Sequence, residues 1–339
     1  MRIAIDAMGG DKAPQEIVLG AVEAARKRGK ESPELVLVGD KARIEQELAN
    51  VDISGLPLTI HHASQSVDMG ESPVMAVRKK KDSSISVAAD LARSGEVDAM
   101  VSAGNTGAAV AATTLKWRTL NGVERPSIAI VMPGPNGIFV LLDAGANSDC
   151  RPKHLLQFAV MGDVYARSIL NIRNPRIGLL SIGEEASKGN ELTKESFKLL
   201  EKSALNFFGN IEGKDVFENK VDVIVCDGFV GNIVLKLSEG LGTTLSKTIK
   251  KEIKQTVLGM IGGILVRSAL KRFKKRLNYE QFGGAPLLGV NGRCIIAHGS
   301  SSSLAIRNAI HVAEDYVMQK VNERIIEAIE QTKSITPIW

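Results

Sequence analysis

The feature that most constrains this chain is the alternation of short apolar runs with longer amphipathic segments. The apolar runs predict β-strands at Arg2–Ile5, Leu35–Val38, Leu58–His61, Ala99–Ser102, Ile128–Met132, Phe139–Asp143, Ile177–Ser181, Val221–Cys226 and Ile295–Ala297. The amphipathic segments predict helices that include Pro14–Arg28, Ala42–Ala49, Ser83–Ser94, Thr106–Leu115, Pro152–Ile169, Thr193–Ala204, Asn232–Lys254 and Ser301–Val321. Strands that alternate with helices predict an α/β fold with a doubly wound, mainly parallel sheet.

The length of 339 residues, 44% of them hydrophobic, suits one large α/β unit. We expect a single catalytic domain over 1–339, and the pattern leaves open whether that domain is divided into two lobes. No apolar run reaches the roughly 18 residues needed to span a bilayer. The N-terminus, "MRIAIDAMGG", starts directly with a strand-like run rather than with a signal peptide. These features predict a cytoplasmic protein.

Six polar turns follow the predicted strands. They read "DAMGGDKAP" (6–14), "SAGNTGA" (102–108), "DAGANSD" (143–149), "SIGEEASKGNE" (181–191), "CDGFVGN" (226–232) and "AHGSSSS" (297–303). In an open α/β sheet, ligands bind at the carboxyl ends of the strands, where such turns gather. The turn at 102–108 also begins a helix, whose N–H groups and positive end favour an anion. Ordinary turn formation would explain some of these glycines, so both interpretations stay open for any single turn.

Several familiar catalytic motifs are missing from the sequence. There is no G-x-x-x-x-G-K-[ST] loop for ATP, no G-x-G-x-x-G after a strand, and no G-x-S-x-G elbow. The histidines at 61, 62, 154, 298 and 311 do not pair at metal-ligand spacing, and the three cysteines form no C-x-x-C pair. We therefore expect neither a metal ion nor a cofactor. Such a chain can still catalyse group transfer if it positions two substrates with an anion cradle, a cation and carbonyl-polarising donors.

The post-strand turns contain side chains suited to these tasks. Lys188 lies in a glycine-flanked turn, where it is either a functional cation or a solvated charge before a helix. Asp227 directly follows a strand, so it is either a carboxylate that orients a ligand or a helix N-cap. His298 is either a base or phosphate ligand or a turn residue. Four asparagines could donate side-chain N–H bonds: Asn105, Asn147, Asn190 and Asn232.

Cys150 offers a different chemical route. It precedes Arg151 and the helix predicted from Pro152, and a cysteine at a helix start can have a lowered pKa. An acyl-cysteine intermediate is therefore an alternative to direct transfer.

The basic character of the chain is local. The net charge is +5, yet the segment from Lys247 to Arg276 alone has ten Lys and Arg residues against one acid, Glu252. Its apolar centre, "TVLGMIGGILV" (256–266), has helical spacing, and Gly262 and Gly263 could break it into a hairpin. We therefore predict a protruding amphipathic helical hairpin over 247–277.

This hairpin suits an anionic membrane surface, where its apolar residues would lie among acyl chains and its lysines near lipid headgroups. The alternatives are a helix pair at a homodimer interface and contact with an acidic protein partner. Nucleic acid is not expected as a partner, because the segment has few stacking aromatics. A second basic run, Arg78 to Lys81, suits phosphate or an acidic partner, with a solvated face as the alternative.

The motifs "DAMGGD", "SAGNTGA", "DAGAN", "EEASKGNE", "DGFVGN", "FGGAPLLG" (282–289) and "HGSS" occur in this order along the chain. Through them the sequence closely resembles the bacterial phosphate acyltransferase family of phospholipid synthesis, over residues 1–320. The resemblance implies transfer of a fatty acyl group from acyl-[acyl carrier protein] to inorganic phosphate, which gives acyl phosphate. It also implies an isocitrate dehydrogenase- and phosphotransacetylase-like fold, a homodimer and peripheral membrane association. A non-catalytic membrane scaffold that recruits acyl carrier protein is the alternative.

The residues fit the implied reaction. Phosphate is itself the nucleophile, so no nucleophilic side chain is required, and positioning and charge stabilisation can supply most of the rate. Lys188 and Asn232 are the candidates to stabilise the oxyanion or hold phosphate in line, and Asp227 would orient Lys188 or the phosphate. The candidates for phosphate or substrate binding are Gly104, Asn105, Thr106, Gly107, Asn147, Asn190 and His298.

Overall fold

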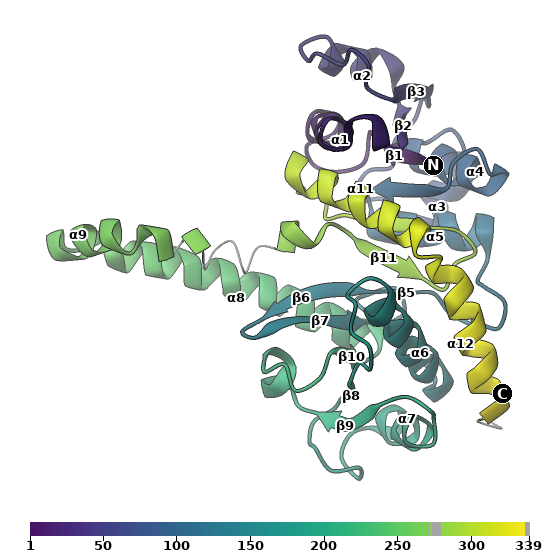
Figure 1. Cartoon of the computed structure of the whole chain (residues 1–339), viewed down its shortest axis with the longest axis vertical. Helices are drawn as coiled ribbons and strands as arrows, with labels where there is room; N and C mark the ends of the chain where they lie inside the picture. The colour runs from purple at the N-terminus through teal and green to yellow at the C-terminus, as the bar shows by residue number, and fades with distance from the viewer. Residues whose placement is uncertain (270, 273–278, 336–339) are drawn as a thin grey trace.

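The computed structural model of the chain describes residues 1–269, 271–272 and 279–335. Its strands form two sheets, which occupy the upper and lower halves of Figure 1. The seven-stranded sheet has the order β3 (Leu58–His62), β2 (Glu34–Gly39), β1 (Arg2–Asp6), β4 (Ala99–Ser102), β12 (Cys294–Ile296), β11 (Ala285–Leu288) and β5 (Ser127–Ile128). The five-stranded sheet has the order β6 (Ile130–Gly134), β7 (Gly137–Leu142), β10 (Val223–Val225), β8 (Ile177–Leu180) and β9 (Phe207–Ile211).

Most strand pairs are parallel, which confirms the predicted fold class. Only β11, which pairs with β12 and β5, and β6, which pairs with β7, run antiparallel among the described strands. The central strands are buried on both faces; Ile3, Ala4 and Ile5 of β1, for example, are at most 1% exposed. Near-continuous apolar runs are typical of parallel strands that are covered by helices on both sides.

Helices cover the sheets and connect their strands. They are α1 (Gln15–Arg28), α2 (Lys41–Leu48), α3 (Pro73–Lys79), α4 (Ser84–Ser94), α5 (Thr106–Trp117), α6 (Pro152–Ser168), α7 (Glu191–Glu201), α8 (Gly228–Lys254), α9 (Val257–Leu265), α11 (Ser303–Met318) and α12 (Val321–Ile335), with 3₁₀ turns η1 (Gly29–Glu31), η2 (Gly213–Phe217) and η3 (Tyr279–Phe282). One continuous core contains Val101 of the first sheet, Tyr165 of α6 and Val223 of the second sheet. The two sheets are therefore packed around a shared core.

One predicted strand is divided between the two sheets. The apolar run at 128–132 forms the end of β5 and the start of β6, which are separated by Ala129. Ser127 and Ile128 pair with β11, whereas Ile130 to Gly134 pair with β7. The sequence left the number of lobes open, and this crossover is where the chain passes from the first sheet to the second.

The basic segment forms two helices, but its break differs from the prediction. α8 runs away from the sheets, and α9 lies beside its far part (Figure 1). The chain turns at Gln255 and Thr256, where the Thr256 hydroxyl oxygen accepts the Gly259 N–H at 2.9 Å. The sequence predicted a break at Gly262 and Gly263, and this prediction is wrong, because both glycines lie inside α9. A side chain at Gly263 would lie 2.6 Å from Ile253, so this glycine permits close packing of α9 on α8.

The rest of the predicted hairpin lies partly outside the described residues, since 270 and 273–278 are not among them. Within the part that is described, no helix combines the length and the apolar character required to cross a bilayer.

Candidate active site

A cavity of about 550 Å³ lies between the carboxyl ends of the two sheets. Four of the six polar turns reach it: Thr106 and Gly107 follow β4, Ala144 and Gly145 follow β7, Asn232 follows β10, and Ala297 and His298 follow β12. The turn at 6–14 lies behind this polar end, where the Asp11 N–H donates to the Gly299 carbonyl at 2.8 Å. The cavity is therefore the place where the predicted turns meet.

The start of α5 forms one wall of the polar end. Asn105 is its N-cap, and the Asn105 side-chain oxygen accepts the Ala108 N–H at 3.0 Å. The first-turn N–H groups of Thr106 and Gly107 have no acceptor among the described residues. Orphan N–H groups at the positive end of a helix form an anion-binding arrangement. The Gly104 N–H donates to the Ser102 hydroxyl at 3.1 Å, so Gly104 stabilises the turn and does not offer its N–H to a ligand.

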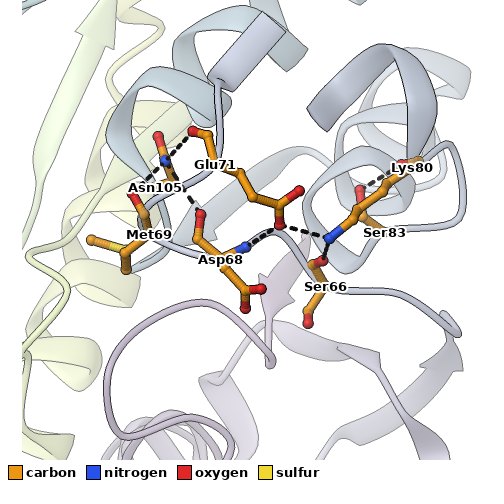
Figure 2. Close-up of polar contacts among 7 residues, drawn as sticks. All are labelled: Ser66, Asp68, Met69, Glu71, Lys80, Ser83 and Asn105. Atoms are coloured by element: carbon orange, nitrogen blue, oxygen red, sulfur yellow. Dashed lines mark hydrogen bonds and ion pairs between the residues drawn. The ribbon is translucent and has the colours of Figure 1, made fainter. Parts of the chain in front are cut away.

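The Asn105 amide is engaged by the chain itself, as Figure 2 shows. Its N–H₂ donates to the carbonyl oxygens of Asp68, Met69 and Glu71 at 3.4, 3.0 and 3.3 Å. The same loop is held from its other side by Lys80, whose ammonium lies 2.6 Å from the Glu71 carboxylate. The structure thus places the Asn105 side chain between a helix cap and a loop, where it positions α5 and has no N–H directed at a ligand.

Asp143 organises the opposite wall. Its carboxylate accepts the backbone N–H groups of Ile128, Gly145, Ala146 and Asn147 at 3.0, 3.3, 3.1 and 2.8 Å. The Asn147 amide donates to the same carboxylate at 2.7 Å and to the Pro126 carbonyl at 2.6 Å, so both of its N–H groups are used. Burial raises the pKa of Asp143, while these hydrogen bonds act in the opposite direction. Asn147 therefore supports the turn instead of facing the cavity as a donor.

Asn232 reaches the cavity from the second turn of α8. Asp227 is the N-cap of this helix, and its carboxylate accepts the Val230 N–H at 2.8 Å. Gly231 lies against the Asp143 backbone with no room for a side chain, which lets α8 approach the turn closely. As a result, the Asn232 side chain lies over Gly145, 3.5 to 3.7 Å from the position that a Cβ would take there. The structure brings Asn232, Thr106 and His298 to one cavity.

His298 lies on the cavity wall after β12. Its Nδ1 accepts the Ser300 N–H at 3.2 Å and lies 2.8 Å from the Ser300 hydroxyl. This contact assigns the proton of the neutral ring to Nε2. Behind His298 lies the turn at 6–14. Its Gly10, at φ +112°, has no side chain and can therefore pack closely against the Ala103 and Gly299 carbonyls.

Gly104, Asn105, Asn147 and Asp227 support the cavity walls without lining them, and the last two predicted residues, Lys188 and Asn190, also lie outside the lining. Lys188 is exposed in the loop between β8 and α7, at the same sheet edge as Asp227, because β8 and β10 are parallel. The structure gives the Lys188 ammonium no ion-pair partner among residues 1–269, 271–272 and 279–335, and it records no contact with Asp227. Asn190 is the N-cap of α7, where its side-chain oxygen accepts the Thr193 N–H at 2.9 Å.

The larger part of the cavity is apolar, and the sequence analysis did not predict it. The apolar lining residues are Ile128, Ile130, Val131, Met132, Pro133, Phe217, Leu235, Leu241, Leu245, Phe282 and Ile296. The sequence feature that could have predicted this apolar wall is the α8 segment "NIVLKLSEGLGTTLSKTI", which has apolar residues on more than one helical face.

Cys150 does not fit the acyl-cysteine route. Burial, followed by the charges of Asp143 and Asp227, raises the pKa of its thiol to about 12. The Cys150 thiol also donates to the Asn147 carbonyl at 3.6 Å and does not line the cavity. The lowered pKa expected at a helix start is wrong here, because desolvation and two nearby carboxylates disfavour the thiolate that a nucleophile needs.

The fold matches that of solved phosphotransacylases. The chain superimposes on EutD phosphotransacetylase from Staphylococcus aureus with a TM-score of 0.59 and 17% identity, over 94% of each chain. The branched-chain phosphotransacylase from Enterococcus faecalis V583 gives a TM-score of 0.56 and 15% identity, over 93% of this chain and 99% of that chain. The class defined here is therefore the phosphotransacetylase-like α/β fold, as the sequence predicted.

The family follows from closer relatives. Residues 1–324 match the family described as "Fatty acid synthesis protein". A phosphate acyltransferase from Geobacter sulfurreducens is 52% identical, over 97% of this chain and 94% of that protein. One from Pelotomaculum thermopropionicum is 53% identical, over 97% of this chain and 95% of that protein. The chain belongs to this family, and it is an acyltransferase of phospholipid synthesis, which confirms the predicted family and enzyme class.

Proposed function

We propose that this acyltransferase transfers a fatty acyl group from acyl-[acyl carrier protein] to inorganic phosphate and releases acyl phosphate. The observation that carries the proposal is the composition of one cavity. Its polar end joins the start of α5 with Asn232 and His298, and the same cavity continues between apolar walls. A site for a small oxyanion next to a site for hydrocarbon suits a reaction between phosphate and a fatty acyl thioester.

In this mechanism the N–H groups of Thr106 and Gly107 hold phosphate at the start of α5. A phosphate oxygen attacks the thioester carbonyl carbon, and a C–O bond forms while the carbonyl oxygen becomes an oxyanion. The Asn232 amide stabilises that oxyanion from the opposite wall. The C–S bond then breaks, and the thiolate of the carrier protein leaves and takes up a proton.

The remaining candidates act around this centre. His298 donates to phosphate or relays the proton to the departing thiolate. Lys188, whose charge has no partner among the described residues, supplies positive potential from the adjoining loop. Asp227 acts through α8, because the cap it provides fixes the turn from which Asn232 projects. The start of α5 is held in place by Gly104 and Asn105, and the turn after β7 by Asn147. Asn190 caps α7, the helix that follows the Lys188 loop.

The partner surfaces lie on three helices. Arg78, Lys79 and Lys81, at and just after the end of α3, are exposed and suit the acidic carrier protein. α3 lies close to the site, since a side chain at Gly107 would lie 2.6 Å from Pro73. The α9 residues Leu258, Ile261, Ile264 and Leu265 are 53% to 82% exposed and suit insertion into an anionic membrane surface next to the lysines of α8.

A homodimer would cover the remaining apolar surface. Every fourth residue of α8 from Ile233 to Ile249 is a leucine or isoleucine that is 40% to 68% exposed: Ile233, Leu237, Leu241, Leu245 and Ile249. A contiguous apolar stripe of this kind marks an interaction surface. The stripe borders the open side of the cavity, because Leu241 and Leu245 belong to both.

The deciding experiment incubates the purified protein with acyl-[acyl carrier protein] in the presence and absence of inorganic phosphate. Direct transfer predicts phosphate-dependent release of free carrier protein, with acyl phosphate trapped by hydroxylamine as the hydroxamate. A scaffold would bind the carrier protein without release in either condition. An acyl mass on Cys150 in intact-protein mass spectrometry would instead support the covalent route.

A further inference from the structure

The cavity is long as well as apolar. It is lined by α8 from Asn232 to Leu245, which are 13 residues apart and therefore span about 20 Å at the helical rise of 1.5 Å per residue. The facing wall runs from Ile128 through β6 to Pro133, about 16 Å at the rise of an extended strand. Both walls therefore lead away from the polar end over a similar distance.

The chemistry of the lining changes along this length. Thr106, Asn232 and His298 gather at one end, where α5 and α8 begin. The far end, next to the tip of the β6–β7 hairpin, is formed by Met132, Pro133, Leu241, Gly242 and Leu245. The charged lining residues between the two ends, Lys236 and Glu239, pair with each other at 2.9 Å.

We propose that this far end binds the terminal part of the acyl chain and sets the longest chain that the enzyme accepts. The inference rests on the proposed function, which places the acyl carbonyl at Asn232. From there about 20 Å of groove is available along α8, which exceeds the roughly 15 Å that one leaflet's acyl chains occupy in a 30 Å hydrocarbon core. A groove of this length accommodates a full membrane fatty acyl chain, and its apolar walls favour each methylene that leaves water.

Gly242 is the position at which this can be tested. It lines the cavity, and apart from its chain neighbours and the backbone of its own helix no atom lies within 4 Å of the position that its Cβ would take. A leucine there occupies space that a long chain needs while leaving the polar end unchanged. Gly240 provides a matched control, because it lies on the same helix, also has open space around its Cβ position, and does not line the cavity. Replacing either helical glycine raises helix propensity, so loss of folding is not expected.

The experiment compares kcat/KM for octanoyl- and hexadecanoyl-loaded carrier protein in the parent, Gly242→Leu and Gly240→Leu. We expect Gly242→Leu to lower the hexadecanoyl-to-octanoyl ratio by at least about tenfold, the scale of discrimination by hydrocarbon fit. Octanoyl activity should stay within about twofold of the parent, and Gly240→Leu should leave the ratio unchanged. An unchanged ratio in Gly242→Leu, or an equal fall with both chain lengths, would overturn the inference.

A failure of the proposed function gives a different result. In that case the parent protein releases no acyl phosphate from either substrate, whatever the chain length. The chain-length inference is then tested by binding, with the affinity of each protein for the two loaded carriers measured by fluorescence anisotropy. A selective loss of hexadecanoyl-carrier affinity in Gly242→Leu supports the inference, and equal affinities for the parent and this variant contradict it.

Discussion

The carboxylate of Asp143, which follows β7 of the five-stranded sheet, accepts the backbone N–H of Ile128 in β5 of the seven-stranded sheet at 3.0 Å. The N–H of the next residue, Ala144, donates a hydrogen bond to the Ile128 carbonyl, also at 3.0 Å. The two sheets are thus joined next to Gly145, where the second wall of the cavity begins. The geometry of the site depends on this junction, since Asn232 lies directly over Gly145.

Asp143→Ala is expected to lower stability and activity together. It leaves several buried N–H groups without acceptors, each worth about 1–3 kcal/mol, so we expect the free energy of unfolding to fall by more than about 3 kcal/mol. Urea unfolding measures the loss. Asp222→Ala is the control, because it removes hydrogen bonds to Arg176 at the other end of the second sheet. Equal activities per folded molecule in the two variants would contradict the role given to Asp143.

Asn105→Ala should separate positioning of α5 from simple helix capping. Loss of an N-cap costs about 1 kcal/mol of stability. Here it also releases the loop at 68–71, so we expect the KM for phosphate to rise about tenfold with a smaller effect on kcat. Asp40→Ala, which removes the N-cap of α2, is the matched control and should leave the KM for phosphate unchanged. A similar KM in both variants would show that Asn105 acts only as a cap.

Lys188→Ala should lower kcat by about 100-fold if its charge stabilises the transition state. Lys198→Ala is the control, because Lys198 is an exposed lysine on α7 that pairs with Glu195 at 2.7 Å. Circular dichroism should show the same fold for both variants. Turnover of Lys188→Ala within about threefold of the parent, against the roughly 100-fold loss expected of a lost catalytic charge, would remove this residue from the mechanism.

Reversing the charges of Arg78, Lys79 and Lys81 should weaken recognition of the carrier protein. We expect the KM for acyl-[acyl carrier protein] to rise about tenfold at low ionic strength, and the difference from the parent to shrink as salt screens both proteins. Lys80 is left unchanged because it holds the Glu71 loop. A KM for phosphate that rises equally would point to distortion of the site rather than to lost docking.

Leu258→Glu with Ile261→Glu should reduce binding of the protein to anionic vesicles. Burial of each large apolar side chain contributes about 1.5–3 kcal/mol, so we expect the vesicle partition coefficient measured by flotation to fall by more than about tenfold. Leu115→Glu, an exposed leucine at the end of α5, controls for added charge alone. Undiminished flotation of the double variant would rule out α9 as the membrane contact.

Local sequence patterns predicted most of the central fold. The strand at Ala99–Ser102 was predicted with the bounds that the structure has, because a fully buried parallel strand is a short apolar run between polar turns. β11 and β9 were missed. β11 contains a proline, and Phe207–Ile211 contains Gly209 and Asn210, all of them residue types that are depleted in strands. The break in the basic segment was misplaced: Gly262 and Gly263 lie inside α9, where Gly263 permits close packing on α8, and Thr256 caps the start of the new helix.

By itself, the sequence determined the class of fold, the family and the set of polar turns at the strand ends, because hydrophobic periodicity and turn chemistry are local properties of the chain. Only the tertiary structure decided which side chains face the ligand. Asn105 and Asn147 were as plausible as Asn232 in the sequence. In the structure, however, the Asn105 amide donates to carbonyls of the loop at 68–71, and the Asn147 amide donates to the Pro126 carbonyl and to the Asp143 carboxylate of its own turn. The apolar groove beside Asn232 likewise exists only because β6 and α8, about a hundred residues apart, face each other across a gap that hydrophobic packing leaves unfilled.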